Sequence, residues 1–436
     1  MFTDAKKDVN LLSKSNEKIF FIYSIVLLLY PAIVFSSAEK WSLINFFIYA
    51  FSSLIVLFCI QSIRINSILS WNIFGFAYFL CLWMNCLQLS EVQTEKTIFD
   101  LYSMIVGPLG FLLLLFFFEK IKITSVTPSI PLVNLNLIYI VFIILYCVVS
   151  VHIESIVGWR ITAIQAEHRI ISGDRFVVPF FSGFWSILGW SLVILAPYVR
   201  KRYAITAIAL IFIISGILHV KRGDIIRVLL FFIIYYVSTS NIQVNKQTHR
   251  YLILFALSVI TVVIFVIFGQ WRLAQSGNDW QTIINISGVR INSAFVAWLF
   301  GYLIIQFDVF SLSTKALASP LYVPNDWGVL MTSDSLPTTS EMVPINGFNA
   351  ATAFWDFVRD YGALFWLEMF IFWGIAVLLL GLSKKTNCKS AYCFTAMLCA
   401  LMIFGNYFAS RSIVLAIVVS NLIFFISNKN QKLISQ

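Results

Sequence analysis

The chain has 436 residues, of which 60% are hydrophobic and only 11% are charged, and its formal net charge is +10. Soluble globular proteins carry about 25% charged residues, so this composition excludes an ordinary soluble domain and indicates a polytopic membrane protein. The basic residues that produce the positive charge gather in short turns between apolar segments. An excess of basic residues in the loops on one side of the membrane accounts for that arrangement. The positive charge is therefore no sign of a nucleic-acid partner, and we expect none.

Apolar segments follow one another along most of the chain, and a helix needs about 20 such residues to cross a bilayer. We predict about twelve transmembrane helices, near 19–36, 42–60, 68–88, 98–118, 131–151, 178–198, 204–218, 225–239, 251–270, 363–382, 390–409 and 412–427. The sequence therefore predicts an all-α membrane protein with a single integral membrane domain over residues 1–436. The first segment follows a polar stretch and lacks a small-residue cleavage site, so we expect a retained span.

The turns on one predicted side of the membrane are rich in lysine and include Lys120, Arg200–Arg202 and Lys384–Lys385. Cytoplasmic loops of membrane proteins carry an excess of Lys and Arg, so we assign this side to the cytoplasm. Both termini fall on the same side. The opposite side has two long segments, a first outer loop at 152–177 and a large outer loop at 271–361.

The first outer loop and the turn between the seventh and eighth spans both carry arginine. The loop reads "HIESIVGWRITAIQAEHRIISGDRF", and the turn reads "HVKRGD" over residues 219–224. The two flanking spans are short, about 22 Å at 1.5 Å per residue, which places the turn below the membrane surface. Arg227 follows one helical turn later and either faces a cavity or extends to the interface while paired with Asp224.

The large outer loop contains four prolines between residues 320 and 344 and an apolar run, "AFVAWLFGYLIIQF", at 294–307. Fourteen apolar residues are too few to span a bilayer comfortably, so we expect a re-entrant or interfacial helix there.

The end of the large loop, "NGFNAATAFWDFVRDYGALFW", combines charge with aromatic residues. On a helix, Asp356, Arg359 and Asp360 lie along one face. This segment has two readings: a helix start whose carboxylates favour the positive end of the dipole, or the edge of a cleft that binds a sugar.

Arginine predominates over lysine on the outer side, whereas lysine predominates in the cytoplasmic turns. A guanidinium binds phosphate or carboxylate through two parallel hydrogen bonds, so the bias indicates recognition of an anion. No phosphate-binding glycine loop, metalloprotease motif or hydrolase triad is present, and the cysteines lie in spans or a short turn. We therefore expect no metal or other cofactor, and a lipid-linked diphosphate as the ligand.

The layout resembles that of bacterial O-antigen polymerases of the Wzy type. The resemblance rests on about twelve spans, two principal outer loops, "KRGD" between two mid-chain spans, and the pattern N-x-x-T-A-F…DYG within residues 349–362. It implies a glycosyltransferase of the C-type superfamily in the bacterial inner membrane, with its outer loops in the periplasm. Its expected partners are the undecaprenyl-diphosphate-linked oligosaccharide, the lipid bilayer, a chain-length regulator and a flippase.

The resemblance also implies the reaction, in which a growing glycan moves from undecaprenyl diphosphate onto a single lipid-linked repeat unit. The lipid diphosphate is the leaving group. The candidates for binding it are the outer arginines Arg160, Arg169, Arg175, Arg222, Arg290 and Arg411. Related ligases carry a histidine in the large loop, and this loop lacks one.

The acceptor hydroxyl needs at most a weak base, because the transition state becomes cationic at the sugar. The candidates are the carboxylates of the large loop nearest the membrane, Glu341, Asp356 and Asp360. Two other functions stay open. A lipid-linked oligosaccharide flippase or transporter predicts charges deep within several spans and an internal repeat. An O-antigen ligase shares the donor and differs in its acceptor.

Overall fold

The computed structural model describes residues 43–65, 69–87, 90–91, 93, 95–126, 133–167, 176–219, 221–239, 284–285, 288, 293, 297, 300–301, 303–316 and 352–427. Within these residues the chain is helical and forms no β-strand. The predicted all-α class is thereby confirmed for this part of the protein.

The first half of the chain contributes a series of long and short helices. Their bounds are α2 (Leu43–Ile65), α3 (Ser70–Asn85), α4 (Ile98–Leu101), η1 (Tyr102–Val106), α5 (Gly107–Lys120), α6 (Leu135–Val157), α7 (Arg160–Glu167), α8 (Phe181–Leu195), η3 (Ala196–Tyr198), α9 (Lys201–Ile211), η4 (Phe212–Leu218) and α10 (Arg222–Thr239). The second half contributes α14 (Gln306–Ala316), α16 (Ala353–Tyr361), η7 (Gly362–Leu364), α17 (Trp366–Lys385), α18 (Lys389–Ala400), η8 (Leu401–Ile403), η9 (Tyr407–Ala409) and α19 (Arg411–Ser427).

Among the described residues, six helical segments are long and apolar enough to cross a membrane. They are Leu43–Ser62, Ile98–Lys120, Leu135–Ala163, Phe181–Tyr198, Lys201–Leu218 and Trp366–Lys385. Predicted spans also coincide with α3, α10, α18 and α19, which are shorter or more charged. The predicted spans at 19–36 and 251–270 lie outside the described residues, so the total of twelve stays a prediction.

The re-entrant helix predicted at 294–307 lies partly outside the described residues. Inside them, α14 begins at Gln306 and continues to Ala316, beyond the predicted end of that helix. Phe300, Ile304 and Ile305 are buried in a small apolar cluster with Val309. The described residues of the apolar run therefore pack within the protein.

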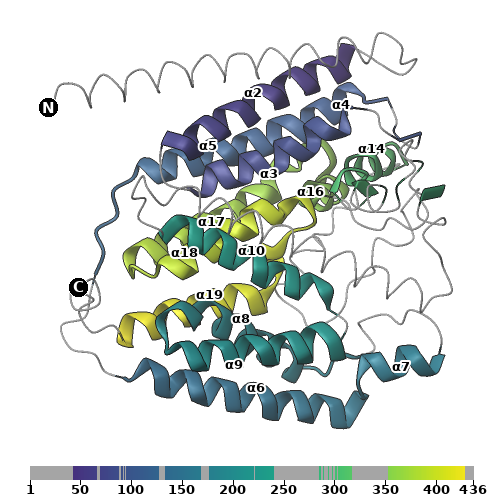
Figure 1. Cartoon of the computed structure of the whole chain (residues 1–436). Helices are drawn as coiled ribbons and strands as arrows, with labels where there is room; N and C mark the ends of the chain where they lie inside the picture. Colours follow the sequence, from purple (N-terminus) through teal and green to yellow (C-terminus); the bar gives the residue numbers. More distant parts are fainter. Residues whose placement is uncertain are drawn as a thin grey trace, which may run out of the picture.

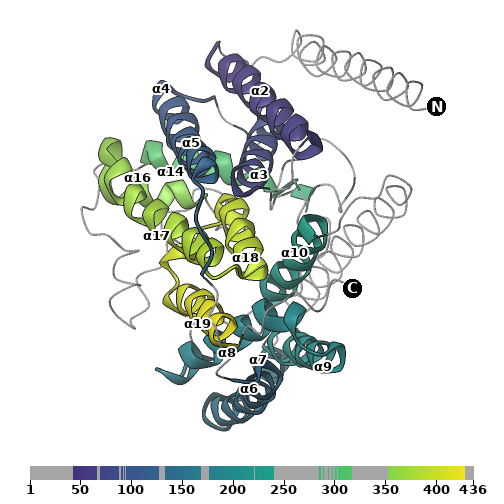
Figure 2. The same ribbon diagram turned by 90° about the vertical axis from the view of Figure 1, so that its left-hand side faces the viewer.

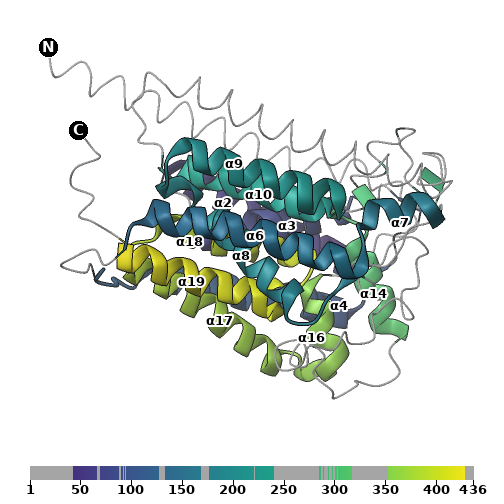
Figure 3. The same ribbon diagram turned by 90° about the horizontal axis from the view of Figure 1, so that it is seen from below.

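The helices lie side by side and their connections gather at two ends of the bundle (Figure 1). Three turns that we predict to be cytoplasmic lie at one end. The first precedes α6, the second joins α8 to α9, and the third joins α17 to α18. The opposite end carries α7, α14 and α16, as the view from below also shows (Figure 3). These three described turns therefore share one end of the bundle, and α7, α14 and α16 mark the end that we predict to be the outer one. The sides of the membrane that the two ends face stay a prediction.

Helix α18 lies near the middle of the bundle when the helices are seen end-on (Figure 2). Nearly all of its side chains are buried, including Ala391, Ala396 and Phe394. It packs against α3, α17, α10 and α8. A helix that is apolar on every side is buried on every side, and small residues such as Ala391 let neighbouring helices approach closely.

A buried ion pair attaches α14 to the rest of the bundle. The Lys96 ammonium lies 2.7 Å from an Asp308 carboxylate oxygen, and both side chains are almost fully buried. The Asn85 amide donates to the other Asp308 oxygen at 2.6 Å. A second contact nearby has Ser311 donating to Asp100 at 2.9 Å. These contacts fix the start of α14 against the end of α3 and the segment before α4.

We predict that Lys96→Met destabilises the protein by about 3 kcal/mol or more, because it leaves the Asp308 carboxylate buried without its cation. Thermal unfolding of the purified protein in detergent measures this change. The double variant Lys96→Met/Asp308→Leu is the control, since it removes both charges and is expected to recover much of the lost stability. Equal unfolding temperatures for Lys96→Met and the unmodified protein would contradict the prediction.

Candidate functional site

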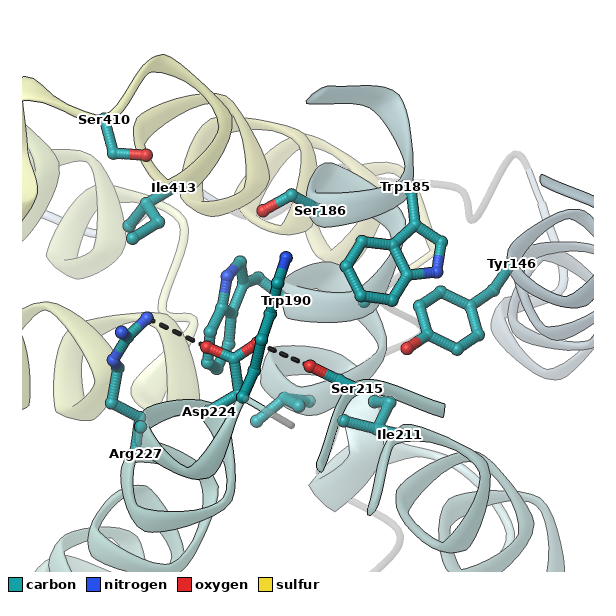
Figure 4. A pocket seen from close by; sticks show the side chains of 14 residues that line it. Tyr146, Trp185, Ser186, Trp190, Ile211, Ser215, Asp224, Arg227, Ser410 and Ile413 are labelled. Carbon is teal, nitrogen blue, oxygen red and sulfur yellow. Dashed lines mark hydrogen bonds and ion pairs between the residues drawn. The ribbon is translucent and has the colours of Figure 1, made fainter. Parts of the chain in front are cut away.

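A cavity of about 480 Å³ opens among α6, α8, η4, α10 and the start of α19, near the end of the bundle that carries α7. Figure 4 shows the side chains that face it. It is lined by Tyr146, Trp185, Ser186, Gly189, Trp190, Val193, Ile211, Ser215, Lys221, Gly223, Asp224, Arg227, Ser410 and Ile413. The lining combines charged groups, aromatic rings and aliphatic side chains.

The turn that carries "KRGD" is held by η4, a seven-residue π-helix that continues α9. The Ser215 hydroxyl donates to an Asp224 carboxylate oxygen at 2.5 Å, and the Lys221 amide donates to the Ser215 carbonyl at 3.0 Å. Gly216 permits this close approach, because a Cβ at that position would lie 2.4 Å from the Ile225 side chain. π-Helical segments inside α-helices occur frequently at functional sites.

Arg227 lies on the first turns of α10 and points toward the cavity (Figure 4). Its guanidinium is 3.2 Å from Asp224, and it lies over the rings of Tyr407 at 4.8 Å and Trp190 at 5.4 Å. Both readings of Arg227 from the sequence therefore apply together. It pairs with Asp224 one turn earlier, and it also faces a cavity.

Lys221 provides a second cation, with its ammonium 4.7 Å from the centre of the Trp185 ring. The Trp185 ring in turn stacks on Tyr146 at 5.4 Å and donates from its indole nitrogen to Ser150 at 2.7 Å. These contacts hold the ring in one orientation. Lys221 has access to the cavity, yet the surrounding protein removes part of its hydration and, together with Arg227 and Arg160, lowers the pKa of the ammonium.

A smaller cavity of about 40 Å³ shares Lys221 and Trp185 with the larger one and adds Arg160 and His219 to its lining. His219 is buried against the rings of Trp159 and Trp185. Burial, followed by the charges of Lys221 and Arg160, lowers the pKa of His219 to about 4. The imidazole is therefore neutral at pH 7.

The two adjoining cavities place three cations, Arg160, Lys221 and Arg227, near one carboxylate, Asp224. The charged side chains that line them thus carry a net positive charge. Partly desolvated cations attract an anion more strongly than cations in bulk water do. The arrangement is suited to binding an anionic group attached to an apolar chain, since Val193, Ile211 and Ile413 line the same cavity.

Of the predicted diphosphate-binding residues, Arg160 lines a cavity, and Arg222 and Arg411 are next to lining residues in the chain. Arg160 lines the smaller cavity. Arg222 begins α10, and its two neighbours in the chain, Lys221 and Gly223, line the larger cavity. Arg411 begins α19, is exposed, and directly follows the lining residue Ser410. Arg169, Arg175 and Arg290 lie outside the described residues.

The predicted site set did not include Lys221, Asp224 or Arg227. The sequence pattern that could have identified them is the "KRGD" turn, with Arg227 three residues after Asp224. No sequence pattern identified the aromatic lining, because Trp185 and Trp190 lie in an apolar span where tryptophan is not distinctive.

The predicted catalytic carboxylates Asp356 and Asp360 lie on α16, away from the lining of both cavities. Arg359 binds both of them, with Nη1 3.0 Å from Asp356 and Nε 2.8 Å from Asp360. Arg359 and Asp360 are buried, and Asp356 stands in the first turn of α16. This geometry favours the structural reading of the segment. Glu341 lies outside the described residues.

Within the described part of the chain, no three His, Cys, Asp or Glu side chains lie close enough together to hold a metal ion. The cysteines there are unpaired thiols.

No protein-family model matches this chain, and neither a curated protein nor a solved structure was found that is similar to it.

We predict that His219 makes stability depend on pH between about 4 and 6.5. The unfolded chain binds a proton to this residue below pH 6.5, whereas the folded protein binds it only near pH 4. Stability is therefore lost as pH falls, by about 2 kcal/mol at pH 5 from this group alone. His219→Phe keeps the ring contacts, so its unfolding temperature should fall less between pH 7 and pH 5. An equal fall in both proteins would refute the assignment.

Proposed function

We propose that the protein is an integral membrane glycosyltransferase that polymerises oligosaccharide repeat units carried on undecaprenyl diphosphate. The observation that carries this proposal is the cavity lined by Lys221, Asp224 and Arg227, with Arg160 beside it. It lies at the end of the bundle that charge sidedness predicts to be periplasmic. The resemblance in layout to O-antigen polymerases supports the same function.

The reaction needs stabilisation of a diphosphate as its bond to the sugar breaks. Preorganised cations in a partly desolvated site are the most effective means of stabilising such developing charge. Arg227 is held by Asp224 and by two aromatic rings, so its guanidinium is oriented before substrate binds. Lys221 and Arg160 add charge from the adjoining turn and from α7.

The remaining side chains of the cavity are suited to the sugar and to the prenyl chain of a lipid-linked glycan. The rings of Trp185 and Trp190 offer flat apolar surfaces against which a sugar ring packs, and their positions are fixed by contacts with Tyr146 and Arg227. The aliphatic side chains of Val193, Ile211 and Ile413 provide the surface for the first part of a prenyl chain.

The acceptor hydroxyl loses a proton as the new glycosidic bond forms. Asp224 is the carboxylate that lines the cavity among the described residues, so it is better placed to receive that proton than Asp356 or Asp360. Its two oxygens accept from Ser215 and contact Arg227, which fixes their direction toward the cavity (Figure 4). A carboxylate is a sufficient base where the sugar carbon is already cationic in the transition state.

We predict that Arg227→Ala lowers the rate of polymerisation by about 10²-fold or more, because it removes a preorganised cation from the leaving group. The readout is gel analysis of surface glycans from cells that carry the variant in place of the native chain. Long chains should disappear, and lipid core bearing one repeat unit should remain. Arg202→Ala is the matched control. It removes the same charge from an exposed position on α9 at the opposite end of the bundle and should leave long chains intact.

Normal long chains in Arg227→Ala cells that contain the usual amount of protein would overturn the proposal. Deletion of the whole chain distinguishes a polymerase from the two alternatives, a ligase and a flippase. A ligase deletion leaves bare core and accumulates lipid-linked polymer, and a flippase deletion traps single repeat units on the cytoplasmic face.

A further inference from the structure

A second cavity, of about 250 Å³, lies at the end of the bundle opposite to the first. It is formed where α5, α10 and α17 end and where α18 begins. The polar side chains in its wall include Glu119, Ser238, Ser383, Lys384, Asn387, Lys389 and Tyr392. The glycosyltransferase reaction proposed above makes no use of this cavity.

Glu119 organises the cavity wall. One of its oxygens accepts from the Ser70 hydroxyl at 2.6 Å and from the Tyr392 hydroxyl, and the other lies 2.6 Å from the Lys384 ammonium. The Glu119 side chain is only 5% exposed. Its charge is therefore engaged inside the wall, and its contact with Lys384 fixes the position of that ammonium.

The Lys384 ammonium keeps donors for a ligand. An ammonium has three N–H groups, and the contact with Glu119 uses one of them. The side chain is 22% exposed, and its ammonium stands 4.5 Å from the Phe118 ring centre, so it is partly desolvated and oriented. Both conditions strengthen binding to an anion.

Further donors surround the same space. Lys389 is exposed at the first position of α18, a twelve-residue helix whose amino end carries partial positive charge. Asn387, beside it, has a left-handed backbone with φ of 58° and an exposed amide. In the wall, the Ser238 oxygen lies beside the Cys393 thiol and has no hydrogen-bond partner of normal geometry among the described residues.

We infer that this cavity binds a phosphate-bearing anion, namely the headgroup of an anionic phospholipid in the leaflet at this end of the bundle. Two ammonium groups, an amide and a helix amino end converge on a space bounded by helix ends, the depth at which phosphates of a bilayer lie. Basic pockets between transmembrane helices on the cytoplasmic side are typical sites for such headgroups. The charge pattern of the turns predicts that this end is the cytoplasmic one.

The test compares two charge-removing variants of the full chain. Lys389→Gln removes an ammonium from the cavity, and Lys385→Gln removes one from an exposed neighbour on the same turn that does not line it. Thermal unfolding in detergent is followed while dioctanoyl phosphatidylglycerol is added, with dioctanoyl phosphatidylcholine and inorganic phosphate as separate probes. We expect phosphatidylglycerol to raise the unfolding temperature and Lys389→Gln to weaken its apparent affinity roughly fivefold.

The unmodified protein and Lys385→Gln should respond equally. A matching response to inorganic phosphate would support a phosphate site that does not need the lipid tails. Equal losses in Lys389→Gln and Lys385→Gln would overturn the inference, because diffuse attraction to the basic end would then account for binding. The inference also fails if phosphatidylcholine stabilises the protein as well as phosphatidylglycerol does. Glycan polymerisation is not measured, so either result is independent of the proposed function.

Discussion

The cost of placing a charge in an apolar environment governs where this protein can keep its ionisable groups. An unpaired ion inside a protein or a bilayer loses several kcal/mol of hydration, so such groups are retained beside a partner or beside a water-filled space. The pairs described here follow this rule. They lie at the ends of the helices, as with Asp224 and Arg227 or Glu119 and Lys384, or where a segment folds back against the bundle, as with Lys96 and Asp308.

Local and long-range pairs have different consequences for the fold. Asp224 with Arg227, and Asp356 with Arg359, are three residues apart on one helix, so the helix alone brings them together. Lys96 and Asp308, like Glu119 and Lys384, are brought together only when distant segments pack. The long-range pairs therefore select one arrangement of helices, whereas the local pairs orient a cation on a helix that already exists.

Hydropathy was sufficient to predict the all-α class of the described residues. Three turns that the charge pattern assigns to the cytoplasm lie together at one end of the bundle, and the side of the membrane that this end faces stays a prediction. Hydropathy and charge also located the "KRGD" turn. They could not distinguish the carboxylates of α16 from that of α10, because both segments show an aspartate three residues before an arginine. The difference comes from packing: Arg359 on α16 is buried, whereas Arg227 on α10 lines a cavity. The aromatic wall depends likewise on how α8 meets α6 and α10, which no local pattern encodes.

Exposure separates the ion pairs that hold the structure from those that can meet a ligand. In the Lys96–Asp308 pair the side chains are 4% and 0% exposed, so a ligand would have to break the pair and take up the full cost of an unpaired buried charge. In the Asp224–Arg227 pair they are 18% and 20% exposed, and Lys384 is 22% exposed beside a buried Glu119. There the carboxylate orients the cation while part of the cation still faces the cavity. An arriving phosphate then completes a hydrogen-bond shell and leaves the original pair in place. The same physical arrangement recurs at both ends of the bundle, and it underlies the two anion sites that we propose, one for a reacting diphosphate and one for a lipid headgroup.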